Sequence, residues 1–186
     1  SLLKVENTIL NLKFSQAKDH KQWLDIDEDI LYRQTVYQHN DVDIIIRSER
    51  FLDSKQRYIY IKYSFETSGD IQLDFFHGFN VNLHATDVKT EAITSESKSI
   101  WIKTDHPNQM LMLYDKDFRH QNKNKGHQAL EHYQIFTEAN RTYTICKYVG
   151  VGKNIEALKR RLKAHQNKGY NAIKENHIKA KNKNFK

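Results

Sequence analysis

A group of acidic residues near position 25 is the first feature of this sequence that could do chemistry. Paired carboxylates act as a general acid and a general base when they converge in a dry cleft. The acids here are Asp25, Asp27, Glu28 and Asp29. Consecutive acids at a turn are usually solvated, so we interpret this group as an acidic turn. We therefore predict no catalytic residue in this chain.

Ten histidines raise the question of a metal site. The candidates are His77, His84, His120, His127 and His132. None of them has the i, i+4 spacing of two ligands on one helix, and no group of cysteines accompanies them. We interpret the histidines as a feature of composition and expect no metal and no cofactor.

Aromatic side chains are candidates for stacking on sugar rings, because a flat apolar face suits a pyranose. The four considered are Trp23, Trp101, Tyr114 and Phe118. Core packing is the favoured interpretation for both tryptophans. Phe118 lies in a polar segment without periodicity, residues 115–127, which we predict to be a long exposed loop.

Composition indicates a folded chain of one domain or a little more, with 186 residues, 38% hydrophobic and 11% aromatic. The net charge of +7 is uneven. Residues 153–186 hold nine lysines and two arginines against two glutamates, a net charge of +9, so the first 152 residues carry −2. Nucleic-acid binders usually spread basic residues over a folded face. We interpret the basic tail as a solvated helix face and expect no nucleic-acid partner.

Cys146 is the only cysteine, so no intrachain disulfide can form, which fits a reducing, cytoplasmic location. No leader peptide is evident. No apolar run approaches the roughly 18 residues that a membrane span needs. We therefore expect no membrane partner.

From Val5 to about Val151 the pattern is mostly that of strands. Residues 43–47 and 58–63 are rich in β-branched and aromatic residues, and in the second run alternate side chains share a face. Turn-forming residues follow at 38–41 and 67–70. Further strands are expected near 30–38, 70–76, 82–93, 98–104, 109–114, 131–137 and 141–150. Many short strands with regular turns predict an all-β antiparallel sandwich.

After Gly152 the hydrophobic period changes to that of helices. Asn154 is a suitable N-cap, Gly169 a suitable C-terminal stop, and a second helix is expected to begin near Tyr170. The apolar stripe of the two helices consists of Ile155, Leu158, Leu162, Tyr170 and Ile173. Such a stripe needs a partner, and without a following domain we expect part of it to be exposed.

Short motifs follow one another in a fixed order from about residue 20 to residue 180. They are Leu24-Asp25 with Leu31 and Arg33, Arg50-Phe51, Phe76-His77-Gly78 with Asn82, Lys147-Tyr148-Val149, Ala157-Leu158, and Gly169-Tyr170 with His177. In this order they resemble the N-terminal β-sandwich domain of the family 65 glycoside hydrolases and phosphorylases. That family includes maltose, trehalose, kojibiose and nigerose phosphorylases.

The chain departs from the family pattern at several positions. The family usually has Gly at the place of Asp29, Arg at the place of Glu49 and Asp at the place of His77. Tryptophans usually follow the position of His177, where this chain has Lys181. These departures fit either a divergent member or a relative whose activity is lost.

The resemblance implies a galactose-mutarotase-like supersandwich over residues 1–152 and a helical linker over residues 153–186. In the family the linker leads to an (α/α)6 barrel that carries the catalytic groups, and this chain lacks that barrel. The chain alone is therefore predicted to be inactive, with the barrel of the same parent chain as its partner. The parent would cleave α-linked glucosyl disaccharides with inversion, and phosphate or water would be the acceptor. A homodimer is a further alternative.

In the family a loop of the sandwich approaches the active site of the barrel. Residues 115–127 are our candidate for this substrate-entrance loop, with Phe118 and His120 as its contact residues. The alternative for the loop is an ordinary exposed segment. The alternative for the whole chain is a stand-alone carbohydrate- or partner-binding sandwich, followed by a bacterial surface or toxin-like β domain.

Overall fold

A computed structural model describes residues 2–5, 8–11, 17–53, 56–80, 90–96, 98–105, 107–117, 119–121 and 128–184. In this part of the chain there are thirteen strands followed by two helices. Their bounds are β1 (Leu2–Val5), β2 (Thr8–Asn11), β3 (Asp19–Asp25), β4 (Ile30–His39), β5 (Val42–Asp53), β6 (Tyr58–Thr67), β7 (Ile71–Asn80), β8 (Thr90–Glu96), β9 (Ser99–Thr104), β10 (Gln109–Tyr114), β11 (Arg119–Gln121), β12 (Gln128–Thr137), β13 (Thr142–Gly152), α1 (Ile155–Lys168) and α2 (Tyr170–Asn184).

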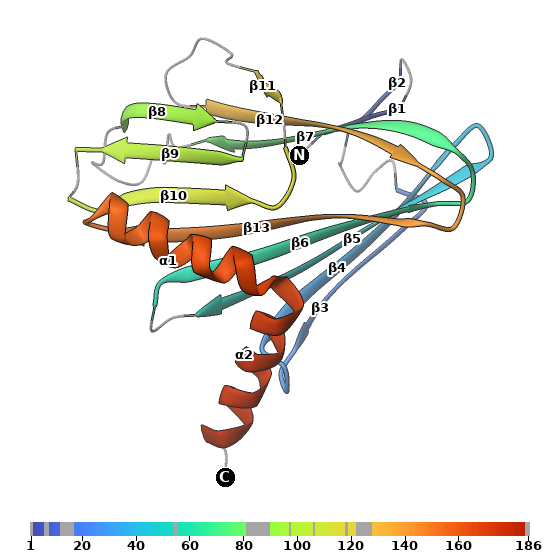
Figure 1. The fold of residues 1–186 in the computed structure, drawn as a ribbon. Helices are drawn as coiled ribbons and strands as arrows, with labels where there is room; N and C mark the ends of the chain where they lie inside the picture. Colours follow the sequence, from blue (N-terminus) through green and yellow to red (C-terminus); the bar gives the residue numbers. More distant parts are fainter. Residues whose placement is uncertain are drawn as a thin grey trace.

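The strands form two sheets (Figure 1). The larger sheet has the order β3-β4-β5-β6-β13-β10-β9-β8, and the smaller one has the order β11-β12-β7-β1-β2. All pairings between neighbouring strands are antiparallel. The predicted all-β sandwich with two C-terminal helices is confirmed.

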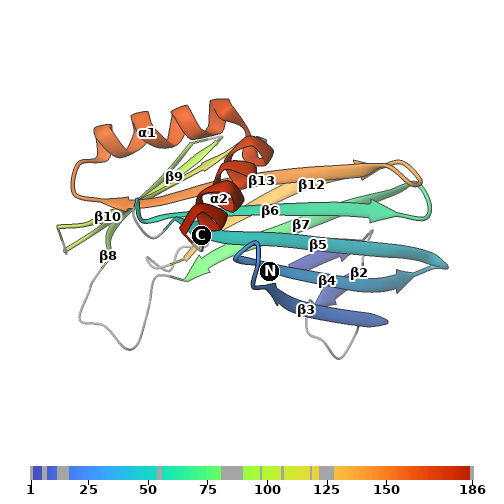
Figure 2. The same ribbon diagram turned by 90° about the horizontal axis from the view of Figure 1, so that it is seen from below.

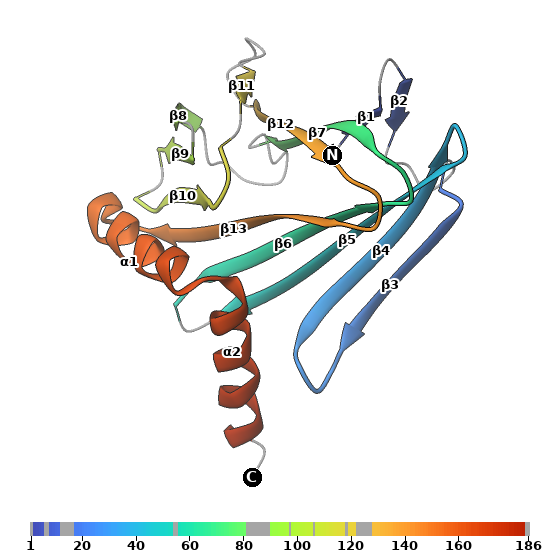
Figure 3. The ribbon, with the colours of Figure 1, turned by 45° about the vertical axis from the view of Figure 1, so that its right-hand side comes forward.

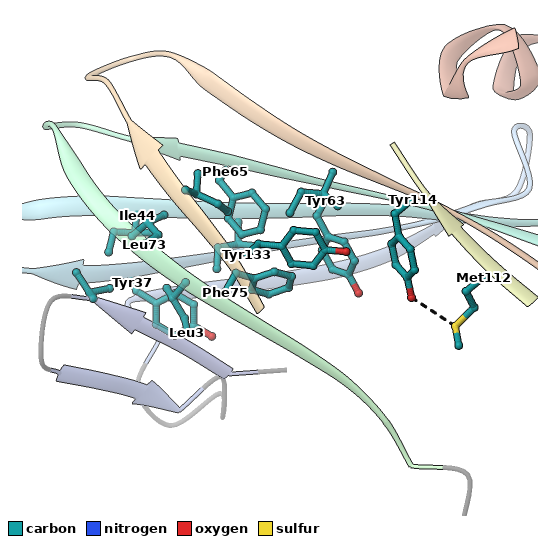
Figure 4. Close-up of a cluster of buried hydrophobic side chains, with 14 of the residues drawn as sticks. Leu3, Tyr37, Ile44, Tyr63, Phe65, Leu73, Phe75, Met112, Tyr114 and Tyr133 are labelled. Carbon is teal, nitrogen blue, oxygen red and sulfur yellow. Dashed lines mark hydrogen bonds between the residues drawn. The ribbon is translucent and has the colours of Figure 1, made fainter. Parts of the chain in front are cut away.

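The larger sheet is covered on both faces. Its inner face packs against the smaller sheet, and its outer face packs against the two helices (Figures 2 and 3). Strand β6 illustrates the alternation that makes this arrangement, because Tyr63 and Phe65 point into the inner core while Tyr58 and Tyr60 point into the helix layer. The two different faces predicted for this strand are thus confirmed. Figure 4 shows part of the inner core.

The helix layer begins and ends as the sequence predicts. Asn154 caps α1, its Oδ1 accepting a hydrogen bond from the Ala157 amide at 3.0 Å. Gly169 adopts a positive φ of 81° at the end of α1, a conformation that favours glycine.

The apolar stripe is largely covered, and within it Ile155 and Ile173 keep the partial exposure that was expected. Leu158, Leu162 and Tyr170 are buried against the outer face of the larger sheet, and Ile155 and Ile173 are partly buried against the same cluster. The stripe finds its partner within this domain, because β10, β13 and β6 present apolar side chains on both of their faces. Neither described helix is long and apolar enough to cross a membrane.

The turns carry the backbone conformations that their residues suggest. Asn40 and Asp41 both have positive φ between β4 and β5, as expected for a tight hairpin. Asp29 has a φ of 57° in the β3–β4 turn, at the position where a Gly was expected from the family resemblance.

Three segments differ from the structure expected for them. Residues 119–121 form β11, which pairs with β12, so the predicted loop is wrong for this piece; residues 118 and 122–127 lie outside the described residues. The strand expected at 82–93 is described only from residue 90, where β8 begins. Strands β1 and β2 were not predicted individually, and β1 lies between β2 and β7.

Candidate functional site

A buried ion pair joins the two sheets. Lys147 on β13 and Glu131 on β12 are both 0% exposed, and Lys147 Nζ lies 2.6 Å from Glu131 Oε2. Taking two charges out of water costs on the order of several kcal/mol per ion, so such a pair requires good geometry and further hydrogen bonds. Lys147 Nζ meets this requirement by also donating to His77 Nδ1 at 2.8 Å.

Tyrosines supply the remaining partners of this ion pair. Tyr133 donates its hydroxyl proton to Glu131 Oε2 at 3.0 Å, and Tyr114 donates to Glu131 Oε1. The Lys147 ammonium lies 5.1 Å from the Tyr114 ring centre and 5.6 Å from that of Tyr63, within the range of cation–π attraction. Figure 4 shows these tyrosines side by side in the inner core.

The environment shifts the protonation of the basic groups. Burial lowers the pKa of Lys147 to about 8, although the adjacent Glu131 carboxylate opposes the shift. Burial, with the positive charge of Lys147, holds the pKa of His77 well below its usual 6.5. His77 is therefore neutral at pH 7. Because its Nδ1 accepts from Lys147, its proton resides on Nε2, which donates to the Tyr63 hydroxyl at 3.0 Å.

A small pocket opens beside Tyr63, between β4, β5 and β7. Its volume is about 110 Å³. It is lined by Arg33, Thr35, Tyr37, Ile46, Ser48, Arg50, Tyr63 and Phe75. Arg33 is paired in register with Ser48, and Arg50 with Leu31, so the two arginines are diagonal neighbours on one face of the sheet. We call this the arginine pocket. Both arginines belong to the motifs that carry the family resemblance.

Arg50 is the more unusual of the two arginines. Its Nε is buried and has no hydrogen-bond partner among the described residues. Its guanidinium forms no ion pair with a described carboxylate, and its charge opposes the rise that burial causes in the pKa of Tyr63. By contrast, Arg47 on the other face of β5 pairs with Glu66 at 2.6 Å.

A larger groove of about 710 Å³ runs along α2 on the outer side of the sheet. Tyr60 and His165 line it, with the Tyr60 hydroxyl 2.7 Å from His165 Nδ1. Phe51 lies against His177 with ring centres 4.8 Å apart, and His177 Nε2 is 3.9 Å from Asp29 Oδ2. The groove is therefore polar and aromatic, and it borders the acidic turn between β3 and β4.

Two lysines of α2 form hydrogen bonds to residues on the outer side of the larger sheet and in the β3–β4 turn. Lys174 Nζ donates to the Tyr32 hydroxyl at 2.8 Å and to Glu49 Oε2 at 2.9 Å. Lys181 Nζ donates to the Ile26 carbonyl oxygen. These contacts bring the C-terminal end of α2 to the β3–β4 turn.

Exposed apolar side chains gather near this end of the domain. Leu24, Ile26, Leu52 and Ile59 are 57%, 76%, 51% and 41% exposed. Leu52 and Ile59 are paired in register on β5 and β6, on the inner face of the larger sheet beyond the arginine pocket. We call these four residues the end patch. Exposed apolar patches of this kind mark interaction surfaces.

The side chains of the two residues predicted for the substrate entrance are not described. Phe118 lies outside the described residues. The backbone of His120 is described in β11, where it pairs with Glu131, but its side chain is not. The proposed substrate-entrance role of these two residues therefore stays a prediction.

The acidic turn is a turn, as interpreted. The Asp25 carboxylate accepts a hydrogen bond from the Glu28 amide at 2.9 Å, which is local turn chemistry. Glu28 in turn accepts a hydrogen bond from the Tyr32 hydroxyl. The described contacts of both acids are thus local, within the turn and the strand that follows it.

The two candidate histidines whose side chains are described, His77 and His132, do not converge, and His84 and His127 lie outside the described residues. His77 is bonded to Lys147 and Tyr63, and His132 Nε2 lies 2.7 Å from Asp74 Oδ1. Among the described residues no three His, Cys, Asp or Glu side chains are grouped so as to hold a metal ion.

For one of the aromatic candidates the predicted core packing is wrong. Trp23 is 47% exposed and stacks on Tyr32, so the expected core packing is wrong for this residue. It lies on β3, which among the described strands is at the edge of the larger sheet and has β4 as its neighbour. Tyr114 is fully buried. Trp101 is partly buried and donates from Nε1 to Gln109.

The ion pair of Lys147 and Glu131 was not predicted from the sequence. A signal was present in the sequence, because Glu131 and Lys147 are charged residues inside segments predicted as strands of a sandwich. Their positions on the inward-facing side would have identified them, but this required the register of two strands on different sheets.

Comparison with solved structures identifies a class of domain. A protein assigned as a kojibiose phosphorylase from the human microbiome aligns with a TM-score of 0.81 and 21% identity, over 97% of this chain and 27% of that one. A heparinase III aligns with a TM-score of 0.54 and 8% identity, over 82% and 23%. The heparan sulfate lyase HepC from Pedobacter heparinus gives 0.53 and 8%, over 82% and 24%. These likenesses show a β-sandwich fold, and the chain spans about a quarter of each of those proteins.

The sequence narrows the class to one family. Residues 2–183 match the model of the glycosyl hydrolase family 65 N-terminal domain. The chain belongs to this family, as the motifs indicated. No curated protein sequence matches it.

Proposed function

We propose that the chain is the non-catalytic N-terminal domain of a glycoside phosphorylase or hydrolase that acts on α-linked glucosyl disaccharides in the cytoplasm. The family match over residues 2–183 carries this proposal. The similarity to a kojibiose phosphorylase supports it. In this proposal the acid that protonates the leaving oxygen comes from the catalytic barrel, and this domain supports the barrel without taking part in bond cleavage.

The end patch is our proposed docking surface for the barrel. The barrel follows the two helices in the family, and the C-terminal end of α2 is held at the β3–β4 turn by Lys181. A domain that continues from α2 would therefore start beside Ile26, the most exposed member of the patch. Covering Leu24, Ile26, Leu52 and Ile59 would remove their apolar surface from water. We further propose that residues 115–127, with Phe118 and His120, shape the substrate entrance.

The first test measures the size of the native protein. An antibody raised against this chain should detect, in the source cells, a band several times larger than 22.1 kDa. Phosphorolysis and hydrolysis of α-linked disaccharides would then be assayed on that larger protein and on the isolated chain, which should be inactive. A band at the size of the chain would contradict the proposal.

The second test addresses the docking surface in the larger protein. The double variant Leu52→Asp/Ile59→Asp should lower the thermal midpoint and the activity, because two charges would enter an apolar interface. Phe136→Asp is the control, since Phe136 is 71% exposed on the smaller sheet. Equal effects of the two variants would contradict docking at the end patch. Self-association of the isolated chain that the double variant abolishes would identify a second copy as the occupant.

A stand-alone carbohydrate-binding module is the second candidate. The groove along α2 favours it, because its volume of about 710 Å³ falls in the range of ligand sites. Calorimetric titration of the isolated chain with maltose, trehalose and kojibiose tests this. Saturable binding would support the module, and its absence would favour the enzyme domain.

A further inference from the structure

We propose that the arginine pocket binds a small oxyanion, a carboxylate or a phosphate group, held by Arg50 with Arg33 at its side. The inference rests on the pocket alone and does not require the enzyme role proposed above.

The hydrogen-bonding state of Arg50 is the first observation. A guanidinium carries five N–H donors, and a buried donor left without an acceptor costs free energy. Arg50 Nε is such a donor among the described residues. A planar oxyanion that approaches the pocket can accept from Nε and from a terminal nitrogen together, the geometry in which arginine binds carboxylates most strongly.

The hydroxyl of Tyr63 is the second observation. It accepts a hydrogen bond from His77 Nε2 at 3.0 Å, and no described residue accepts its own proton. Since Tyr63 lines the pocket, this proton is available to a ligand oxygen. Ser48, also on the pocket wall, is a buried hydroxyl donor at 4% exposure, whereas the Thr35 hydroxyl is already bonded to His20 Nδ1 at 2.9 Å.

The charge balance is the third observation. Arg33 and Arg50 project from the same face of the sheet, and both line the pocket. The nearby Lys147 is already compensated by Glu131, so Arg50 is the group to consider. Burial is the largest cause of the lowered pKa of His77, and the charge of Lys147 is the next. The charge of Arg50 adds a smaller contribution. An anion in the pocket would offset the charge of Arg50, which forms no ion pair with a described carboxylate.

The size of the pocket limits the ligand. A volume of about 110 Å³ is below the roughly 300–1,000 Å³ of sites for drug-sized ligands. It corresponds to about three or four water molecules. A carboxylate or a phosphate fits, whereas a sugar ring does not. The oxyanion has two sources, a side-chain carboxylate from a domain docked on the adjoining end patch or a free inorganic anion.

The test is a nuclear magnetic resonance titration of this chain with sodium acetate and with sodium phosphate, at constant ionic strength set with sodium chloride. Acetate represents a side-chain carboxylate. The observed signals are the Arg50 Nε–Hε pair, assigned from its absence in Arg50→Lys, and the Ser48 backbone amide. We expect saturable shifts of both signals with at least one anion, while chloride alone gives none.

Matched variants connect the binding to the pocket. Arg50→Gln should weaken anion binding about tenfold or more, followed at the Ser48 amide, because a charged donor is lost. Arg50→Lys keeps the charge but loses the planar fork, so it should reduce acetate binding more than phosphate binding. Tyr63→Phe should weaken both. Arg141→Gln is the control, since Arg141 is 74% exposed and pairs with Glu138.

The outcomes separate the sources. Preference for acetate would identify a docked carboxylate, and preference for phosphate would identify a free anion. The absence of saturable shifts with either anion would overturn the proposal, as would equal affinities in the native chain and a folded Arg50→Gln or Arg50→Lys variant. Neither result would alter the size of the native protein or the activity of the larger enzyme, so this failure is distinct from failure of the proposed function.

Discussion

Lys147 and Glu131 face each other from different sheets of the sandwich, with 2.6 Å between Nζ and Oε2 and no solvent exposure of either side chain. The pair is the one described contact of opposite full charges in the inner core. Its strength depends on the surrounding tyrosines and His77, which complete the hydrogen bonding of both partners. The inner core is therefore held by a polar cross-link as well as by apolar packing.

Glu131→Gln should destabilise the domain strongly. The substitution leaves the Lys147 ammonium without a compensating charge in the core, and breaking a buried pair typically costs about 3–5 kcal/mol. Urea unfolding followed by tyrosine fluorescence measures the change. Glu138→Gln is the control, because its exposed pair with Arg141 should be worth about 0–1 kcal/mol. If both variants lost a similar unfolding free energy, the buried pair would contribute no more to stability than the exposed pair.

Acid should destabilise the domain through His77. The folded state holds the pKa of His77 well below 6.5, chiefly by burial, so below about pH 6.5 the unfolded chain takes up a proton that the folded chain does not. The contribution of His77 to stability is complete above pH 6.5 and declines as the pH falls, by up to about 1.4 kcal/mol per pH unit.

Unfolding free energies measured from pH 7.5 to 5 in the native chain and in His77→Gln test this relation. The glutamine can still accept from Lys147 and donate to Tyr63, but it does not titrate. We expect the pH slope to be smaller in the variant. An unchanged slope would assign the acid sensitivity to other groups.

Gly150→Ala should weaken the docking of α1. A Cβ at Gly150 would lie 2.8 Å from Leu158 Cδ1 and 2.9 Å from Tyr58 Cδ1, closer than side-chain atoms can approach. Overpacking of this kind costs about 1–3 kcal/mol. Gly152→Ala is a matched control on the same strand, because its Cβ would lie 4.0 Å from Leu158 Cδ1. Thermal midpoints of the two variants measure the difference, and a greater loss at Gly152 would contradict the packing described.

Lys174→Met should loosen α2 from the sheet. The variant loses the hydrogen bonds to Tyr32 and Glu49, and it leaves the partly buried Glu49 carboxylate with one cation fewer. Faster amide hydrogen exchange in α2, with little change in β6 and β13, is the expected result. Lys179→Met, at an exposed position of the same helix, is the control. Equal exchange in both variants would mean that apolar contacts alone hold the helix.

Much of this fold follows from local sequence. The strand alternation at Tyr58–Tyr63, the Asn40-Asp41 turn and the Asn154 cap are each determined by neighbouring residues, and each was predicted correctly. The partner of the helix stripe was not, because whether Leu158 packs on its own sheet or on another domain depends on tertiary structure. Local periodicity defines which face of an element is apolar but does not identify what covers it.

The candidate sites also combine features visible in the local sequence with features that depend on tertiary structure. Arg33 and Arg50 were visible as motif residues, but their convergence needs the register between β4 and β5. The ion pair of Lys147 and Glu131 needs two strands on opposing sheets, so no spacing along the chain could reveal it. Trp23 is exposed because β3 is, among the described strands, at the edge of the larger sheet, which follows from the sheet order and not from its own segment.

The position of Cys146 gives the domain a built-in chemical reporter. The only thiol of the chain belongs to the cluster formed by Leu158, Leu162 and Tyr170 beneath the two helices, and burial raises its pKa to about 12. In the packed state an alkylating reagent has neither access to the sulfur nor a thiolate to attack. The rate of alkylation therefore measures how often the helix layer lifts from the sheet, and it can follow that opening without any introduced label.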